Sequence, residues 1–423
     1  MTDTLTGHDV EEGELPEGWE VRELRELVDV LDSRRKPVNA TERADRPGDV
    51  PYYGATGQVG TIDEALFDED LVLLGEDGVQ FFDPDKQKAY EISGPAWVNN
   101  HAHVLRCNQD LYQQSLLIHF LNQADYRNRA NGTTRLKLTQ AAMKEIPVLT
   151  PPMDEQERIV EILEAQLSRL DTALQSVRTV REKAAQFRRS LLHAAFTGAL
   201  TGHDVEEGEL PNGWESARFG DVADFVRGVT YKKAVARDAM ESGYMALLRA
   251  TNLQDDSIDY GKCVYVPQSV VKPEQWLCPN DLVVATSSGS SSVVGKSGPV
   301  VGAFEGTFGA FCAVIRPHEG IRARYLHLFA QSSDVRQTWS DLARGTNINN
   351  LKEQQMLSTV IPVAPLDEQG RIVEILEDQL SRLDASLAVA DEVEEHSAAL
   401  RRSLLHSAFT GRLTRVWREA VDV

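Results

Sequence analysis

The sequence has little cysteine and no long apolar run. Its four cysteines in 423 residues, Cys107, Cys263, Cys278 and Cys312, are scattered without CxxC spacing, which argues against a disulfide framework or a zinc site. No stretch approaches the roughly 18–20 apolar residues of a membrane span, and the acidic N-terminus lacks the apolar core of a secretion signal. We therefore expect a cytoplasmic protein.

The sequence also lacks a motif that specifies catalysis. SSSVVGKS at 290–297 resembles a phosphate-binding loop, but Gly289 lies one residue too far from the Gly-Lys-Ser end, and the residues that follow cannot continue as a helix. DPDKQK at 83–88 has the composition of a turn and lacks the second acid-x-Lys of a nuclease site. His101 and His103 could ligate a metal, but the sequence shows no carboxylate cluster beside them. We predict no catalytic site and no metal site.

The balance of charge does not favour unassisted nucleic-acid binding. Lys and Arg number 44 against 65 Asp and Glu, a formal net charge of −21. Part of the acidic excess lies in residues 1–19, which hold six acids and no Lys or Arg. Short basic clusters, as at 34–36 and 232–233, can still create local positive potential.

Two segments of the chain occur twice. Residues 5–20 return at 200–215 with 15 of 16 positions identical, and residues 152–201 return at 365–414 with 33 of 50 identical. Between them lie two long windows, 20–151 and 215–364, with little readable similarity apart from similar closing segments. Internal repeats decide how the rest of a chain is interpreted. This arrangement indicates one scaffold that presents two different recognition domains.

The second repeat has the pattern of a long helix. Leucines recur at alternating steps of four and three residues, with charged residues on the other faces, which is typical of a coiled coil. The residues that we predict to pair the helices are Leu163, Leu167, Leu170, Leu174, Leu376, Leu380, Leu383 and Leu387, with Phe187, Leu191, Leu400 and Leu404 near the far ends. Each helix could pack on its own adjacent domain, but the similar seams favour antiparallel pairing of the two helices.

The order of the segments is circular. The chain begins with the linker that follows a helix in its second half, so joining the two termini would complete a second full unit. We predict an α+β fold of two similar mixed α/β recognition domains, separated by the paired helices in a pseudo-two-fold arrangement. The predicted segments are an N-terminal linker at 1–19, domain 1 at 20–151, a helix at 152–199, a linker at 200–214, domain 2 at 215–364, a helix at 365–414 and a tail at 415–423.

Loops of the two windows carry side chains suited to reading base edges. These loops combine amides, hydroxyls, cations and aromatic rings, the groups that hydrogen-bond or stack on bases. The candidates for DNA binding in the first window are Tyr52, Tyr53, Thr56, Gln58, Asn99, Asn100, His101, Thr133, Thr134 and Arg135. Those in the second window are Lys232, Lys233, Arg249, Thr251, Asn252, Ser287, Ser288, Lys296, Arg344, Thr346 and Asn347.

Taken together, these features resemble the specificity subunit of a type I restriction–modification system. The resemblance rests on LPEGWEVREL and LPNGWESARFGD at the start of the windows, on IPVLTPPMDEQERIV and IPVAPLDEQGRIV at the start of the helices, and on their AFTGALT and AFTGRLT ends. PYYGATGQVG, LLGEDG and WVNNHAHVLR within the first window are also typical of that family. The order, the duplication and the circular arrangement all match.

The resemblance implies a non-catalytic subunit whose two domains each read one half of a split, asymmetric DNA site. The paired helices would set the spacer between the half-sites and dock the methylation subunits, of which there are typically two. Those partners would bind S-adenosylmethionine, while restriction subunits would use ATP and Mg²⁺, so no cofactor is expected on this chain. The assembled complex would act as an adenine methyltransferase and an ATP-dependent endonuclease.

Two other classes of function compete with this interpretation. A protein-assembly scaffold that does not bind DNA would suit the acidity and the coiled coil. A hydrolase with an unrecognised site in the second window is a third possibility. A protein that only assembles other proteins would leave DNA methylation unchanged when it is deleted.

Overall fold

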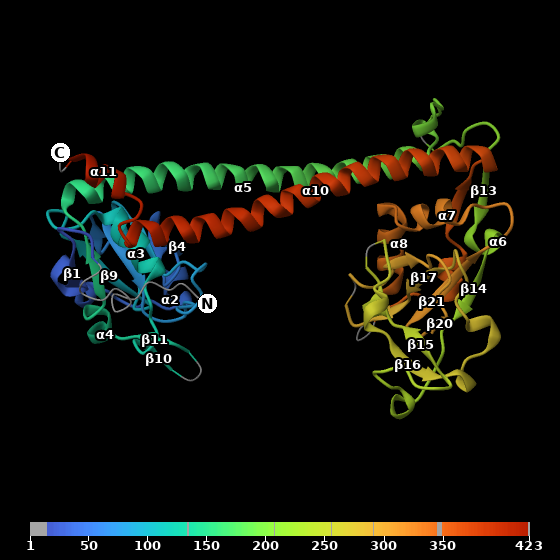
Figure 1. Cartoon of the computed structure of the whole chain (residues 1–423), viewed down its shortest axis with the longest axis horizontal. Helices are drawn as coiled ribbons and strands as arrows, with labels where there is room; N and C mark the ends of the chain where they lie inside the picture. The colour runs from blue at the N-terminus through green and yellow to red at the C-terminus, as the bar shows by residue number, and fades with distance from the viewer. Residues whose placement is uncertain are drawn as a thin grey trace. The chain divides into compact units, whose positions relative to one another are not determined.

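A computed structural model describes residues 15–132, 135–206, 208–254, 256–290, 292–344 and 349–421. The chain divides into two compact units (Figure 1). Unit 1 comprises residues 1–177 and 391–423, and unit 2 comprises residues 178–390. No helix among the described residues is long and apolar enough to cross a membrane.

Unit 1 contains two small four-stranded sheets. One has the order β2-β9-β6-β7 and the other the order β4-β3-β8-β5, and β6 is buried along its whole length. The elements are β1 Glu20–Glu23, α1 Leu24–Leu27, β2 Val28–Val30, η1 Asp32–Arg34, α2 Ala40–Ala44, β3 Val50–Tyr53, β4 Gln58–Ile62, β5 Phe67–Asp68, β6 Leu71–Gly75, β7 Ala89–Ile92, β8 Pro95–Val98, β9 Ala102–Cys107, α3 Gln114–Gln123, β10 Ala130–Asn131, β11 Lys137–Leu138, α4 Gln140–Lys144 and β12 Pro147–Thr150.

Unit 2 repeats the plan of unit 1 with different side chains. Its sheet β14-β21-β17-β19 corresponds to β2-β9-β6-β7, and β13 pairs with β23 as β1 pairs with β12. The elements are η2 Ala199–Thr201, β13 Glu215–Arg218, α6 Phe219–Val222, β14 Ala223–Arg227, η3 Lys233–Val235, β15 Tyr244–Leu248, η4 Ala250–Asn252, η5 Tyr260–Lys262, β16 Val264–Pro267, η6 Gln268–Val270, η7 Pro273–Gln275, β17 Leu282–Ala285, β18 Ser287–Ser288, β19 Ser297–Pro299, β20 Gly306–Phe308, β21 Cys312–Pro317, α7 Ala323–Ala330, α8 Ser333–Ala343, β22 Asn349–Asn350, α9 Glu353–Leu357 and β23 Val360–Val363.

The repeated segments form two helices of equal length, α5 (Met153–Phe196) and α10 (Leu366–Phe409). Each has 44 residues, about 66 Å at 1.5 Å per residue. In unit 1 the first part of α5 shares a buried core with the last part of α10, and in unit 2 the first part of α10 shares one with the last part of α5. The predicted antiparallel pairing of the helices is therefore confirmed.

Equivalent ion pairs link the helices in both units. In unit 1 Arg401 of α10 pairs with Asp171 of α5. In unit 2 Arg188 of α5 lies 3.6 Å from Asp384 of α10. The repeat relates these four residues, since Asp171 corresponds to Asp384 and Arg188 to Arg401. The helix pair therefore repeats its own contacts at its two ends.

Burial of the predicted pairing residues is graded. Leu163, Leu167, Leu376 and Leu380 are buried, whereas Leu170, Leu174, Leu383 and Leu387 are half-buried. Near the far ends Leu191 is buried and Leu404 half-buried, but the prediction was wrong for Phe187 and Leu400, which are 45% and 55% exposed. In this part of the helices the buried seam instead includes the smaller residues Ala184 and Ser397.

A buried glutamate anchors the start of each repeat helix. In unit 2 the Glu368 carboxylate accepts hydrogen bonds from Thr201 Oγ1 (2.7 Å) and Trp214 Nε1 (3.1 Å), and lies 2.7 Å from His203 Nε2. Burial acts to raise the pKa of Glu368, but the hydrogen bonds outweigh burial and hold this pKa below its usual range. The carboxylate thus joins α10 to the linker that follows α5.

The same anchor in unit 1 is built from both ends of the chain. Glu155 of α5 accepts hydrogen bonds from Trp19 Nε1 (2.8 Å) near the N-terminus and from Thr414 Oγ1 near the C-terminus. Gly411, at φ +69°, lies so close to Pro16 that a Cβ would approach the proline Cγ to 2.3 Å, and Gly198 makes the same approach to Pro211. The predicted circular arrangement is confirmed here, because equivalent segments contact a helix end in each unit. These segments are 16–19 in unit 1 and 211–214 in unit 2.

The last residues depart from the symmetry. The sequence predicted only a tail at 415–423, but Arg415–Val421 form a helix, α11. Arg418 of α11 pairs with Glu155 and donates to the Gly411 carbonyl. Arg418 contacts the Glu155 carboxylate in unit 1 as the His203 ring contacts the Glu368 carboxylate in unit 2. A helix outside the repeat therefore completes the first anchor.

We expect Glu368→Ala to lower the free energy of unfolding by about 2–4 kcal/mol, because it leaves the buried Trp214 and half-buried Thr201 donors without their acceptor. Urea unfolding followed by tryptophan fluorescence measures the change. Glu374→Ala, at an exposed position of the same helix, is the matched control and should change stability by less than about 0.5 kcal/mol. Equal effects of the two substitutions would contradict the anchoring role.

We expect unit 2 to lose stability on mild acidification through His327. Burial, helped by the charge of Arg324, lowers the pKa of His327 from 6.5 to about 4. As the pH falls, the unfolded chain therefore binds this proton at a higher pH than the folded chain does. The free energy of unfolding is highest above pH 6.5 and declines as the pH falls toward 4. Between pH 7 and 5 the loss from this group is about 2 kcal/mol. His327→Gln, which cannot titrate, should show a pH dependence smaller by that amount in urea unfolding; identical pH dependences would refute the assignment.

Candidate nucleic-acid interface

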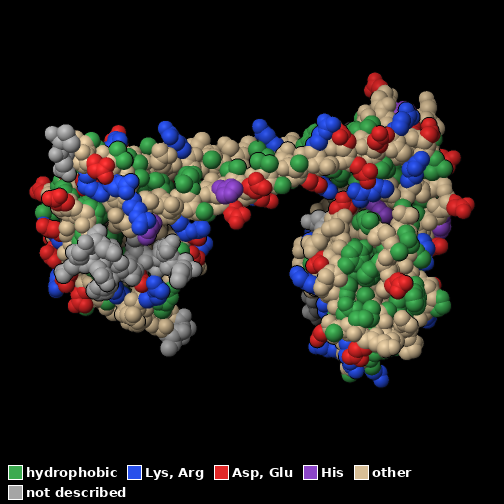
Figure 2. Space-filling view, viewed as in Figure 1, with side chains coloured by type: hydrophobic (Ala, Val, Ile, Leu, Met, Phe, Trp, Pro, Cys, Tyr) green, Lys and Arg blue, Asp and Glu red, His purple; other side chains and the backbone are tan. Residues whose placement is uncertain are grey.

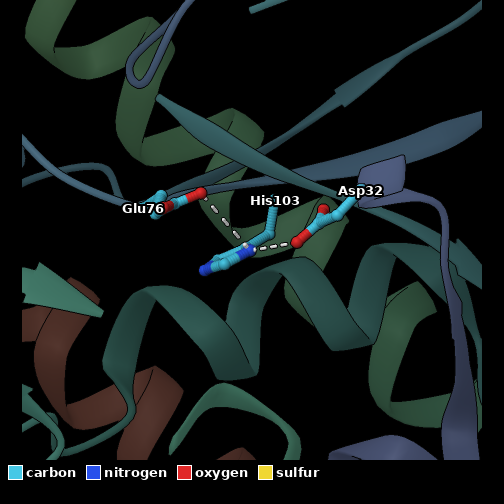
Figure 3. A group of neighbouring side chains, drawn as sticks. All are labelled: Asp32, Glu76 and His103. Carbon is cyan, nitrogen blue, oxygen red and sulfur yellow. Dashed lines mark hydrogen bonds and ion pairs between the residues drawn. The ribbon is translucent and has the colours of Figure 1, made fainter. Parts of the chain in front are cut away.

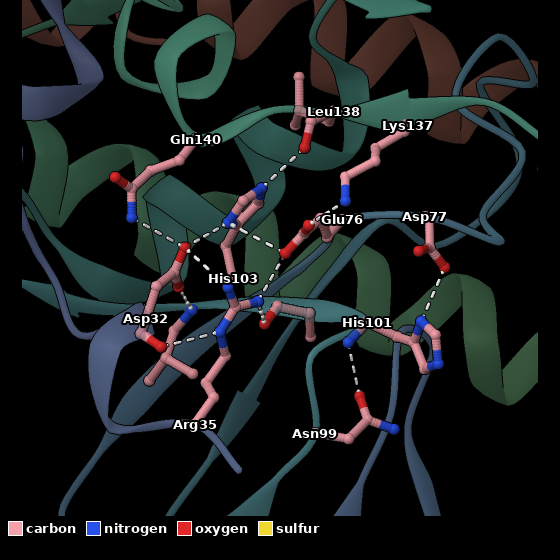
Figure 4. Close-up of polar contacts among 12 residues, drawn as sticks. Asp32, Arg35, Glu76, Asp77, Asn99, His101, His103, Lys137, Leu138 and Gln140 are labelled. Atoms are coloured by element: carbon pink, nitrogen blue, oxygen red, sulfur yellow. Dashed lines mark hydrogen bonds and ion pairs between the residues drawn. The ribbon is translucent and has the colours of Figure 1, made fainter. Parts of the chain in front are cut away.

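Three polar loops of unit 1 meet beyond the end of β6 (Figure 4). Glu76 and Asp77 follow β6, Asn99 and His101 precede β9, and the segment from Arg135 to Leu138 contains β11. Backbone hydrogen bonds hold the loops together, since Glu76 N donates to the His101 carbonyl and Leu138 N donates to the Glu76 carbonyl, both at 2.8 Å. We call this region the β6 junction.

His103 lies buried at the base of the β6 junction (Figure 3). Its Nδ1 is 2.6 Å from Asp32 Oδ2, and its Nε2 is 2.9 Å from the Leu138 carbonyl oxygen. A carbonyl oxygen can only accept, so Nε2 donates to Leu138, and Nδ1 lies within hydrogen-bond distance of Asp32. The imidazole thereby ties the β11 segment to the sheet.

Cations surround the two carboxylates beside His103. Arg35 Nη1 lies 2.6 Å from Glu76 and Arg35 Nη2 lies 3.3 Å from Asp32, while Lys137 Nζ lies 2.8 Å from Glu76. Burial acts to raise the pKa of Asp32, but the hydrogen bond and charge of His103 outweigh burial and lower this pKa. The pKa of Glu76 is also lowered, since Lys137 and Arg35 oppose the effect of its burial.

Asp32, Glu76 and His103 have the geometry of a possible metal site, because their ligand atoms lie within 4.8 Å of one another. Arg35 and Lys137 already form ion pairs with these carboxylates, and both ring nitrogens of His103 lie within hydrogen-bond distance of protein oxygens. A cation would have to displace these contacts. The arrangement fits an ion-pair network better than a metal centre.

Asp77 organises the outer part of the β6 junction. Its Oδ1 lies 2.9 Å from His101 Nδ1 and 2.5 Å from Arg135 Nη2. The Asn99 side chain accepts from the His101 backbone N–H at 2.8 Å. Asp77 itself is mostly buried, while Arg135 and His101 remain partly exposed. Two donors therefore meet on one carboxylate near the surface.

Unit 2 has the same backbone junction, and its equivalent residues that the structure describes have uncharged side chains. Thr286 N donates to the Phe311 carbonyl (2.9 Å), and Leu351 N donates to the Thr286 carbonyl (2.8 Å), as Glu76 and Leu138 do in unit 1. Ser287 pairs with Asn350 where Asp77 pairs with Lys137. Phe311, which is 65% exposed, stands in the place of His101. The two junctions would therefore present different chemistry to a common kind of ligand.

Most of the predicted DNA-binding residues lie at the surface. The exposed or half-buried candidates are Tyr53, Thr56, Gln58, Asn100, His101, Arg135, Lys232, Lys233, Arg249, Thr251, Ser287, Ser288, Lys296 and Arg344. Thr133, Thr134, Thr346 and Asn347 lie outside the described residues. Among the surface candidates, His101 and Arg135 meet at the β6 junction, and Ser287 and Ser288 lie at the junction of unit 2.

The prediction was wrong for three candidates whose side chains are occupied inside the fold. Tyr52 is 1% exposed, and its hydroxyl bonds the backbone of Val38. Asn252 is fully buried, and its amide bonds the backbone of Arg249 and Asp259. Asn99 is buried and orders the loop that carries His101.

Sequence reasoning missed the charged members of the β6 junction. Asp32, Glu76 and Asp77 were not among the candidates, and His103 was judged to have no carboxylate neighbours. The one signal in the sequence was the pair of acids directly after the apolar strand LVLLG. Arg35, the partner of Glu76, is far away in sequence, so this pairing could not be read from spacing.

Acidic and basic side chains are interspersed on the side of both units that Figure 2 shows. Several arginines of unit 1 stack on aromatic rings, with Arg43 over Tyr52 at 4.6 Å and Arg46 over Trp97 at 4.8 Å. Arg46 is also paired with Asp63. Binding of an anionic ligand would thus depend on local groups rather than on a uniformly basic face.

Comparison with known proteins gives a consistent result. The family model described as type I restriction modification DNA specificity domain matches residues 16–177 and again residues 211–394. The EcoKI specificity subunit of Escherichia coli K12 is 40% identical over 214 residues, 51% of this chain and 46% of that protein. The StySPI specificity subunit of Salmonella potsdam is 38% identical over 216 residues, 51% of this chain and 47% of that protein. These matches thus span about half the length of the relatives.

Solved structures agree on the fold. A chain from a type I restriction–modification assembly has a TM-score of 0.66 at 18% identity, covering 95% of this chain and all of that one. The HsdS subunit of Thermoanaerobacter tengcongensis has a TM-score of 0.53 at 17% identity, covering 94% and 98%. The α+β arrangement of two similar domains with two long helices is therefore shared with these proteins.

We expect His103→Gln to loosen the β11 segment, because glutamine cannot donate to Asp32 and to the Leu138 carbonyl at once. Hydrogen exchange of the Leu138 amide should accelerate about 10-fold or more, as expected for loss of a hydrogen bond to a charged group. The Leu351 amide of unit 2 is the internal control and should not change. Faster Leu138 exchange in unaltered protein treated with a chelator would instead indicate a bound metal and contradict the ion-pair assignment.

Proposed function

The chain belongs to the type I restriction–modification DNA specificity family, and on that premise we propose that it is the subunit that reads the DNA target of such a complex. One observation carries the proposal most directly. Two copies of one backbone junction occur in a single chain, charged in unit 1 and uncharged in unit 2. Two different surfaces on equivalent folds suit the two unlike halves of an asymmetric site.

The paired repeat helices supply the rest of the proposed role. Their length would set the spacer between the two half-sites, as protein geometry does in other DNA-binding proteins with two reading elements. Methylation subunits, two in the expected assembly, would dock on the helices. Restriction subunits would join that core and supply ATP-driven translocation and cleavage with Mg²⁺.

Chemistry would then reside on the partner subunits. A methylation subunit that binds S-adenosylmethionine must extract the target adenine from the duplex, so this chain would hold the DNA while the base is flipped. The partners would also supply positive charge that the chain, at −21, does not provide overall. A protein-assembly scaffold that does not bind DNA is less well supported, because the family model describes a DNA specificity domain.

We expect co-expression of this chain with its methylation partner to produce methylation at one split sequence motif. Genome-wide mapping of methylated adenines measures this. Deleting the chain while keeping the methylation partner should abolish the motif. Methylation that persists unchanged without the chain would rule out the proposed function.

Exchanging residues 20–151 for those of another family member extends the same experiment. The exchange should alter one half of the motif and leave the other half and the spacer unchanged. A change in both halves would contradict independent reading by the two units.

A further inference from the structure

Arg135 is a surface arginine held in one position by a carboxylate. Its Nη2 lies 2.5 Å from Asp77 Oδ1, and Asp77 is also fixed by His101 at 2.9 Å. The Asp77 side chain is 16% exposed, whereas that of Arg135 is 57% exposed. The carboxylate is therefore part of the fold while much of the arginine side chain faces outward.

The backbone beneath Arg135 is shaped to accept it. Gly78 has φ +75°, and a Cβ at this position would lie 2.6 Å from Arg135 Nη2 and 3.3 Å from Cζ. A side chain at residue 78 would thus occupy the place of the guanidinium. The absence of a side chain lets the guanidinium lie against the loop that carries Asp77.

The segment that carries Arg135 is anchored next to it. Lys137 Nζ lies 2.8 Å from Glu76, and the carbonyl of Leu138 accepts from buried His103. The Leu138 amide donates to the Glu76 carbonyl. Both the backbone near Arg135 and the end of its side chain are thereby fixed before any ligand binds, which lowers the entropy lost on binding.

The charge of this pair distinguishes between two possible DNA ligands. A phosphate would meet the Asp77 carboxylate together with the guanidinium, so the attraction between full charges would be largely cancelled. A neutral base edge is not repelled, and the planar fork keeps N–H groups suited to two acceptors. Guanine presents such a pair, O6 and N7, in the major groove.

We propose that Arg135, braced by Asp77 over Gly78, is a specificity-determining residue that reads a guanine in the half-site bound by unit 1. This inference rests on the proposed function. It assigns one base of the target to one side chain, and it assigns Asp77 and Gly78 a positioning role.

The test is adenine-methylation mapping with the complete complex that carries Arg135→Ala. One position of the unit 1 half-site that requires guanine should then accept other bases, with discrimination against them falling about 10- to 100-fold. The other half-site and the spacer should stay unchanged. Arg127→Ala is the matched control, because Arg127 is a similarly exposed arginine of unit 1 that pairs with the nearby Asp125. The control should leave the motif as it is.

A glycine pair tests the positioning separately. Gly78→Ala should weaken the preference for guanine at the same position of the motif, because the new methyl group displaces the guanidinium. Gly94 has a similar φ of +71° and open space where a methyl group would lie, so Gly94→Ala imposes the same backbone penalty and should leave the base preference intact. Relaxation by both glycine variants would show a general loss of order and overturn the positioning role.

The outcomes separate the inference from the function. If the unaltered complex yields no split motif, the proposed function fails. If it yields one and Arg135→Ala keeps every base of it, the inference alone fails. Binding that weakens uniformly for all sequences, with a salt dependence shallower by about one unit of slope, would identify a phosphate contact and also overturn the inference.

Discussion

A buried carboxylate at the start of each long helix is the contact on which the rest of the chain depends. Glu155 and Glu368 each collect an indole N–H and a threonine hydroxyl from segments that lie elsewhere in the sequence. Leaving a buried member of this set unpaired is costly, so the helix start and the segment closing the opposite helix stabilise each other. In unit 1 this links the two ends of the chain, and it makes the circular order of the sequence a physical property of the fold.

This anchoring allows the two units to diverge in the residues between the repeats. Because the repeats fix both helix ends, the strands between them need only keep the pairings that bury β6 and β17. The residues just beyond those strands can then differ in side-chain chemistry between the units, although Glu76 and Thr286 are both buried. Glu76, Asp77 and Lys137 occupy this place in unit 1, and Thr286, Ser287 and Asn350 occupy it in unit 2, on the same backbone hydrogen bonds.

The sequence predicted the repeated parts of the fold better than the site. The two similar copies allow the length and pairing of α5 and α10 to be predicted, because leucine spacing is a local signal in the sequence. The β6 junction depends instead on contacts between residues far apart, such as Asp32 with His103, which are separated by 71 positions. Tyr52 is an error of the opposite kind. It was predicted to bind DNA because it lies in a polar segment of the sequence, but its side chain is buried in the core. Position 135 could be named from its loop, but not the carboxylate that holds it.

The proposed function requires an acidic chain to recognise DNA. Affinity for a duplex comes largely from phosphate contacts, which need net positive charge, whereas sequence is read from neutral base edges. A guanidinium already paired with Asp77 contributes little to affinity for the phosphate backbone, but it keeps N–H donors for a base edge. Carboxylates at a reading surface then lower nonspecific binding to the many competing sequences more than they lower recognition of the right one. Acidity is in this way compatible with selective reading, provided that partner subunits supply the attraction to the phosphate backbone.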